Sequence, residues 1–184
     1  MRWYWIDRFT EFESGRLARA VKNISLSEDH LHDHLPGYPV MPNTLILEGF
    51  AQCGGILVGE HLKYQGNMIL AKIPKAIFHF AAVPGDTLTY TTVLEYINAD
   101  GAMVTATSHV GERLQAEAEV VFANVAGGPK ARRLFKPQDL VAMMQLLGAF
   151  NVGRTSDGRP LTAMDALADA GVVHGSAEPT LTNH

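Results

Sequence analysis

The sequence has few of the features that mark exported or membrane-anchored proteins. It contains one cysteine, Cys53, so no intrachain disulfide can form and a reducing compartment is expected. Residues 1–10 include charged side chains and lack the uninterrupted apolar segment of a signal peptide. The most apolar stretch, residues 45–58, is interrupted by Glu48 and Gln52 and is too short to span a bilayer. We therefore expect a cytoplasmic protein.

The chain also lacks a strong excess of charge of either sign. Its formal net charge is −4, charged residues make up 18% and apolar residues 47%, which is typical of a globular protein. No overall positive field would attract nucleic acid or an anionic membrane, and neither is expected as a partner. The 184 residues fit one core domain, which we place at residues 1–125. The linker-like Ala126-Gly-Gly-Pro129 begins an expected extension, residues 126–184, which is partly helical and not a separate domain.

Residues 44–61 are apolar on nearly every side, although four of them are glycines. An amphipathic surface helix would show a polar stripe, so this segment predicts a helix that is buried all round. A glycine in a helix interior costs roughly 1 kcal/mol relative to alanine. One interpretation is that a sheet packs very close to this helix. The other is that the glycines shorten or bend it.

Segments of strand-like composition lie on both sides of this helix. A loop rich in histidine, proline and glycine at residues 29–42 precedes it, and its X-Pro steps argue against helix there. The expected fold class is α+β, with an antiparallel sheet wrapped around one central helix. The expected strands cover residues 17–26, 67–73, 75–81, 87–97, 102–110 and 114–122. In the last of them alternation predicts one buried and one wet face, with Gln115, Glu117 and Glu119 on the wet one.

Two helices are expected after the linker. Pro137 suits the first position of one helix. Thr162 and Asp165 resemble a capping box at the start of a second helix, over residues 162–170.

Glu48 is the exceptional residue of the apolar helix. Burying an unpaired carboxylate is costly, so Glu48 must be paired or held protonated. Gln52 lies four residues further along the same helical face and is in reach of it. A buried Glu satisfied by this amide needs no further role, whereas a protonated Glu is suited to act as a general acid. The sequence leaves both interpretations open.

Three histidines recur at every second residue of the loop before this helix: His30, His32 and His34. Together with Asp33 they suggest a zinc site, but the HEXXH spacing is absent and no second cluster of ligands follows, so we expect no metal. A solvated loop with one functional histidine fits better. A neutral His is a good general base near neutral pH, and His34 with Glu48 would form an acid/base pair.

Residues 34–52, His-Leu-Pro-Gly-Tyr-Pro-Val-Met-Pro-Asn-Thr-Leu-Ile-Leu-Glu-Gly-Phe-Ala-Gln, closely resemble the signature of FabZ-type 3-hydroxyacyl-acyl carrier protein dehydratases. Similarity extends to Ile6-Asp-Arg-Phe, to Ala71-Lys-Ile-Pro-Lys-Ala76 and to Val83-Pro-Gly-Asp86. The resemblance covers residues 5–125 and implies a hotdog fold. It also implies a homodimer, with a trimer of dimers as a larger assembly, whose active sites lie between subunits.

The resemblance further implies a reaction and its residues. The family converts (3R)-3-hydroxyacyl thioesters on acyl carrier protein to trans-2-enoyl thioesters in fatty-acid or related lipid synthesis, without a cofactor. By analogy, His34 is the base and Glu48 of the partner subunit the acid. Substrate-binding positions are expected at Pro36, Gly37, Asn43, Thr44, Gln52, Phe78 and Phe80, and a basic patch for the acidic carrier protein at Lys130, Arg132, Arg133 and Lys136.

This chain departs from the family pattern at two places. It has Asn43 where the family usually has glycine, and Asp33-His34-Leu35 where the family has Gly-His-Phe. Two alternative functions stay open beside dehydration. One is a hotdog acyl thioesterase in which Glu48 activates water, and the other is an inactive protein that binds acyl carrier protein.

Overall fold

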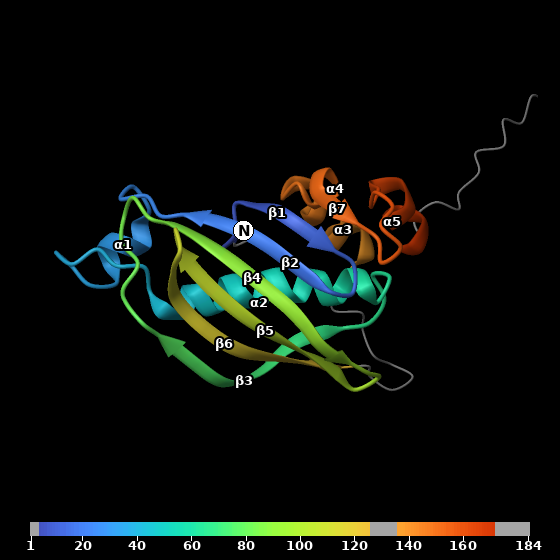
Figure 1. Cartoon of the computed structure of the whole chain (residues 1–184), viewed down its shortest axis with the longest axis horizontal. Coiled ribbons are helices and arrows are strands. Elements are labelled where there is room, and N and C mark those ends of the chain that lie inside the picture. The colour runs from blue at the N-terminus through green and yellow to red at the C-terminus, as the bar shows by residue number, and fades with distance from the viewer. Residues whose placement is uncertain (1–3, 126–135, 172–184) are drawn as a thin grey trace, which may run out of the picture.

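The computed structural model describes residues 4–125 and 136–171 (Figure 1). The elements in chain order are β1 (Arg8–Glu13), β2 (Leu17–Asn23), α1 (Asp29–Asp33), α2 (Asn43–His61), β3 (Met68–Phe78), β4 (Thr87–Ile97), β5 (Gly101–Val110), β6 (Arg113–Asn124), α3 (Pro137–Leu146), α4 (Ala149–Val152), β7 (Gly153–Arg154) and α5 (Ala163–Asp169). Helix α2 lies across the concave side of a strongly curved sheet, with α1 near one end of the sheet and α3 to α5 near the other (Figure 1).

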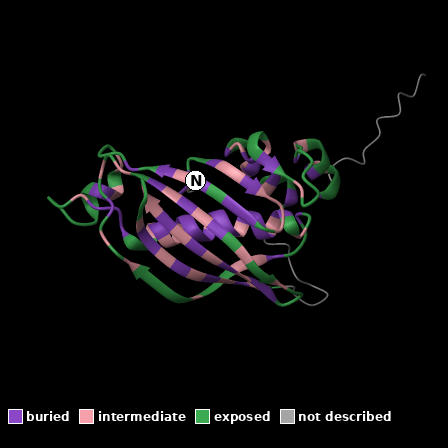
Figure 2. Ribbon diagram, viewed as in Figure 1, coloured by how far each residue is buried: buried purple, intermediate pink, exposed green. Residues whose placement is uncertain are grey.

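The sheet has seven strands in the order β3-β6-β5-β4-β2-β1-β7. All neighbours pair antiparallel except β1 and β7, which pair in parallel. Five of these strands, β2 to β6, contact α2, and most of that helix is buried (Figure 2). The predicted α+β arrangement, a sheet around one central helix with a helical C-terminal extension, is confirmed.

The glycines of α2 are explained by close packing. A Cβ on Gly49 would lie 2.6 Å from Cε2 of Tyr90 in β4, and one on Gly54 would lie 2.8 Å from Cγ2 of Val104 in β5. Neither distance leaves room for a methyl group. The helix runs without interruption from Asn43 to His61, so the first interpretation of the glycines is confirmed.

The structure differs from the sequence-based expectation at two segments. Residues 29–42 were expected to contain no helix, yet α1 forms one short helix there, because Asp29–Asp33 precede the first proline of the loop. Two strands were expected on either side of Pro74, yet β3 runs through it as one strand. Pro74 is tolerated because β3 is an edge strand, and its pairing with β6 shifts register between Lys72 and Lys75.

The alternation expected for the last strand holds with one exception. In β6, Ala116, Ala118, Val120 and Phe122 are buried, while Glu117 and Glu119 are partly exposed. Gln115 was expected on the wet face but is fully buried. Its Nε2 donates a hydrogen bond to the carbonyl oxygen of Phe80 at 2.8 Å, which compensates for the burial of the NH2 end of the amide.

The C-terminal elements share the core of the sheet and helix. Helices α3 and α5 begin where predicted, and the Thr162 hydroxyl accepts a hydrogen bond from the backbone N–H of Asp165 at the start of α5. The Phe9 N–H of β1 donates to the carbonyl of Leu147, and β7 extends the sheet beside β1. The division at residue 125 stays a prediction, since residues 126–135 lie outside the described part. No helix within residues 4–125 or 136–171 has the length and hydropathy needed to cross a membrane.

Candidate active site

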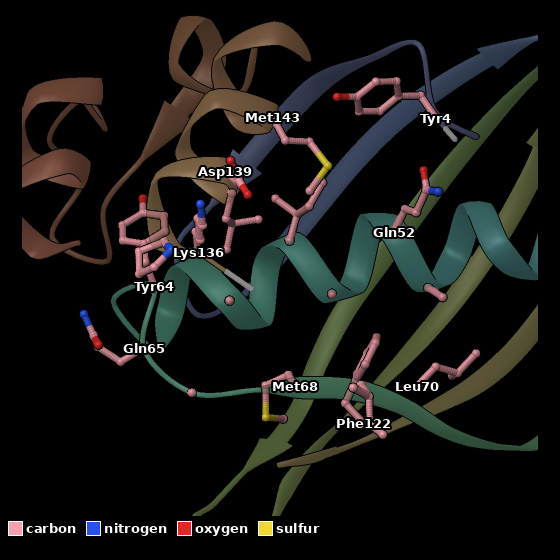
Figure 3. A pocket seen from close by; sticks show the side chains of 18 of the residues that line it. Tyr4, Gln52, Tyr64, Gln65, Met68, Leu70, Phe122, Lys136, Asp139 and Met143 are labelled. Atoms are coloured by element: carbon pink, nitrogen blue, oxygen red, sulfur yellow. The ribbon is translucent and has the colours of Figure 1, made fainter. Parts of the chain in front are cut away.

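A groove of about 530 Å³ runs along the open side of α2, between β3 and α3 (Figure 3). Glu48 and Gln52 of the sequence-based site line it from the first half of α2, and Lys136 lines it from the side of α3. Most of its other lining is apolar. The groove is lined by Tyr4, Glu48, Ala51, Gln52, Gly55, Ile56, Gly59, Tyr64, Gln65, Gly66, Met68, Ile69, Leu70, Phe122, Lys136, Pro137, Asp139, Leu140 and Met143.

Gln52 holds the Glu48 carboxyl group in place. Its side-chain carbonyl accepts a hydrogen bond from the backbone N–H of Trp5 at 2.8 Å. Its Nε2 donates to Oε1 of Glu48 at 3.0 Å. Because the Trp5 N–H can only donate, it fixes which end of the amide faces Glu48. The predicted contact between Glu48 and Gln52 is confirmed, and the half-buried carboxyl group lies at the polar end of an apolar groove.

The three loop histidines have different surroundings. The ring of His30 packs edge-on against Trp5, with the centroids 4.9 Å apart, and burial lowers the pKa of this imidazole. A ring nitrogen of His32 lies 2.6 Å from the carbonyl oxygen of Leu26. His34 follows the last residue of α1, where its backbone N–H donates to the carbonyl of His30, and it is exposed, as is Asp33. His32 is exposed as well, but one of its ring nitrogens is engaged with Leu26, so the exposed His34 is the better candidate for contact with a substrate or a second subunit.

A buried ion pair anchors α1 to the sheet. The ammonium group of Lys22, which is 6% exposed, lies 2.6 Å from Oε1 of Glu28, the N-cap residue of α1, and 3.6 Å from Oδ1 of Asp7. The second oxygen of Glu28 accepts from the N–H of Ser25. Partial burial would raise the pKa of Glu28, but the hydrogen bonds from Lys22 and Ser25 outweigh it and hold that pKa below its ordinary value. The carboxylate is therefore ionised at neutral pH and fixes the start of the helix that precedes His34.

The N-terminus of α2 presents the expected donors. Asn43 and Thr44 are the first residues of the helix and are exposed, and Pro42 is the N-cap residue. The backbone N–H groups of Asn43 and Thr44 have no acceptor within the helix, as in any first helical turn. Lys63 and Tyr64 are the non-glycine residues of the described chain with positive φ, so Asn43 has an ordinary helical backbone. Asparagine in place of glycine therefore causes no backbone strain here.

Of the remaining predicted site residues that the structure describes, only Lys136 lines the groove of a single chain. Pro36 and Gly37 are exposed in the loop before α2. Phe78 packs partly against the core, and the Phe80 ring lies 4.1 Å from the guanidinium carbon of Arg113. Lys136 lines the groove, whereas the basic residues Lys130, Arg132 and Arg133 lie outside the described residues. The roles given to these residues stay predictions.

Several groove residues carry no signal in the sequence. They are Tyr4 and the α3 residues Leu140 and Met143, which reach the groove only through tertiary packing. The same holds for the backbone N–H of Trp5, which contacts Gln52. Cys53 lies in α2 itself and is buried, and burial raises the pKa of its thiol to about 12, which disfavours the reactive thiolate. Across the described ranges, no group of three His, Cys, Asp or Glu side chains is arranged to hold a metal ion.

Comparison with known proteins agrees with this architecture. A family model described as a FabA-like domain matches residues 3–123. The 3-hydroxyacyl-(acyl-carrier-protein) dehydratase FabZ of Pelotomaculum thermopropionicum is 39% identical over 119 residues, which cover 64% of this chain and 85% of that protein. The FabZ of Symbiobacterium thermophilum is 36% identical over 130 residues, covering 70% of this chain and 92% of that protein.

Solved structures resemble the chain in fold at much lower identity. The dehydratase heterocomplex ApeI:P from Xenorhabdus doucetiae has a TM-score of 0.56 at 13% identity, covering 66% of this chain and 82% of that one. The protein smu.793 from Streptococcus mutans, bound to acetyl-CoA, has a TM-score of 0.55 at 14% identity, covering 67% of this chain and 92% of that one.

The fold and the groove together define a hotdog protein, in which a curved sheet encloses one helix and leaves a single helical face open. The chain belongs to the FabA-like family and, within it, to the FabZ-type 3-hydroxyacyl-acyl carrier protein dehydratases.

Proposed function

We propose that this protein dehydrates (3R)-3-hydroxyacyl thioesters carried on acyl carrier protein, giving trans-2-enoyl thioesters in fatty-acid or related lipid synthesis in the cytoplasm. The observation that carries the proposal is the Glu48 carboxyl group, oriented by Gln52 at the polar end of an apolar groove, in a chain of this family. An apolar groove suits an acyl chain, and the carboxyl group suits proton transfer at the carbon that loses its hydroxyl group.

The proposed reaction needs only the protein's own side chains as base and acid. His34 takes the proton from C2 of the substrate, and the electron pair of that C–H bond forms the C2–C3 double bond. The C3–O bond breaks, and its oxygen takes the proton of Glu48 and leaves as water. A proton then returns from His34 to Glu48 through solvent. Each positioned acid or base typically contributes roughly 10²–10⁴-fold to the rate, and no cofactor is needed.

Negative charge develops on the thioester carbonyl oxygen when C2 loses its proton. The N–H groups of Asn43 and Thr44 are suited to stabilise it, because they point out of the first turn of a long helix whose dipole adds to the effect. Asn43 contributes only its backbone in this scheme, which explains how the position accepts a residue other than glycine.

We propose that the two catalytic side chains meet between subunits of a homodimer. The groove of one chain is lined by Glu48 but not by the exposed His34, so the base is supplied by the loop of a partner subunit. Edge strand β3 supports a paired assembly, since it presents an unpaired edge and the exposed side chains of Leu70 and Ile77.

The acidic carrier protein requires a basic docking surface. Lys136 at the groove is its first candidate, and Lys130, Arg132 and Arg133 precede it in the chain.

Incubating the purified protein with 3-hydroxyacyl carrier protein tests the activity directly. Mass spectrometry should show a product lighter by one water. We expect His34→Ala and Glu48→Gln each to lower kcat/KM by roughly 10²–10⁴-fold. The matched control is His32→Ala, which removes the imidazole two residues earlier in the same segment and should keep activity. Release of free carrier thiol without enoyl product would show a thioesterase instead, and binding without turnover would show an inactive carrier-binding protein.

A further inference from the structure

Helix α3 forms one wall of the groove, although it lies outside residues 3–123, where the family model matches. Four residues of α3 line the groove together with its N-cap residue Lys136: Pro137, Asp139, Leu140 and Met143. Figure 3 shows Met143 and Asp139 projecting from α3 over the open face of α2. The extension therefore belongs to the wall of the cavity that contains Glu48.

The approach of α3 depends on a glycine of α2. A Cβ on Gly59 would lie 2.6 Å from Cδ2 of Leu140, so the missing side chain allows Leu140 to reach the helix backbone. Leu140 and Met143 are both partly buried against the core. The C-terminal half of the open face of α2 is therefore covered by two apolar side chains of α3.

The groove has a polar reacting end and an apolar middle, and Lys136 and Asp139 line its far part beside Leu140. Glu48 and Gln52 mark the reacting end, and about 16 Å of helix separates Glu48 from Gly59 at the α-helical rise of roughly 1.5 Å per residue. Between them the lining is formed by Ile56, Phe122 and other apolar side chains. An acyl chain that begins at Glu48 and follows α2 reaches Leu140 and Met143 at its far part.

We propose that Leu140 and Met143 of α3 limit the length of the acyl chain that the enzyme accepts. The inference rests on the proposed function and adds the determinant of its substrate range. The occupant of the groove is the acyl chain of the substrate, because the apolar lining is continuous with the Glu48–Gln52 pair. A shorter side chain at either position lengthens the groove, and a bulkier one shortens it.

The test is the ratio of kcat/KM for a long and a short 3-hydroxyacyl carrier, measured on the same preparation of full-length protein. This ratio is independent of the folded fraction. Leu140→Ala removes three carbons, and each buried methylene is worth about fourfold in affinity. We therefore expect the ratio to rise at least about tenfold in Leu140→Ala and Met143→Ala, and to fall in Met143→Phe. Leu146→Ala is the matched control, because Leu146 is on the same helix and 66% exposed.

Three results would overturn the inference. One is an unchanged ratio in all variants while the unaltered protein dehydrates its substrates, which leaves the proposed function intact. A second is a changed oligomeric state of Leu140→Ala by light scattering with an unchanged ratio, which would show that a second copy of the chain occupies the groove. Absence of dehydration at every chain length in the unaltered protein would remove the proposed function and this inference together.

Discussion

At the scale of single residues, the position of the Glu48 carboxyl group depends on Gln52, which touches Glu48 on one side and the Trp5 backbone on the other. Gln52 is therefore a positioning residue, acting on the reaction through Glu48. The hydrogen bond from Trp5, which precedes Gln52 by 47 residues, fixes the position of Gln52 in the groove.

We expect Gln52→Met to lower kcat/KM by roughly 10- to 150-fold, because loss of a hydrogen bond to a charged or reacting group costs roughly 1.5–3 kcal/mol. The double variant separates positioning from general damage to the fold. In a Glu48→Gln background, Gln52→Met should cause little further loss, since the two residues act as one unit. An equal loss in both backgrounds would contradict the positioning role.

The residues of the site were predictable only in part. The Glu48–Gln52 contact followed from helical spacing in an apolar segment, and the structure confirms it. The difference between His30, packed against Trp5, and the exposed His34 depends on how α1 folds, and alternation along the chain gave no indication of that helix. The groove residues of α3 were not predictable, because they join α2 only in the folded molecule.

At the scale of elements, α2 is a helix that buries nearly all its sides and uses glycine where the sheet approaches. Tyr90 beside Gly49 is fully buried, and its ring packs at a centroid distance of 5.3 Å from Phe50. The environment around Gly55 is looser, since a Cβ there would lie 3.4 Å from the nearest atom of Phe122. The glycines of one helix therefore differ in how much they tolerate a side chain.

We expect Gly49→Ala and Gly54→Ala to lower the free energy of unfolding by about 1–3 kcal/mol, because the methyl group overpacks the contact with Tyr90 or Val104. Gly55→Ala is the matched control. It gains up to about 1 kcal/mol of helix propensity and meets only ordinary contact distances, so it should be neutral or stabilising. Urea unfolding of the three variants measures the differences. Equal destabilisation at all three positions would refute the packing explanation.

Element boundaries followed from the sequence where local chemistry determines them. The turn between β4 and β5 forms at Asn98–Gly101, between the expected strands at residues 87–97 and 102–110. The Asn98 N–H donates to the Gly101 carbonyl, and the Asn98 side chain accepts from the Gly101 N–H. Strands β1 and β7 were not assigned from the pattern. β7 consists of two residues that become a strand by pairing with β1, a contact that sequence periodicity does not encode.

At the scale of the whole molecule, the proposed active site takes its base and its acid from different copies of the chain. The fold contributes an open groove with Glu48, a loop that presents His34 to the outside, and an edge strand available for pairing. A C2 dimer would contain two equivalent sites, each built from His34 of one subunit and Glu48 of the other.

Two defined heterodimers test this arrangement most directly. In both, the subunits carry different affinity tags and are purified through both tags after co-expression. The first pairs a His34→Ala chain with a Glu48→Gln chain. The second pairs an unaltered chain with a chain that carries both substitutions. Sites shared between subunits predict about half of the unaltered activity in the first heterodimer, which keeps one intact site of two, and almost none in the second. The reverse result, an inactive first heterodimer and a half-active second one, would place both side chains in the same subunit and contradict the account.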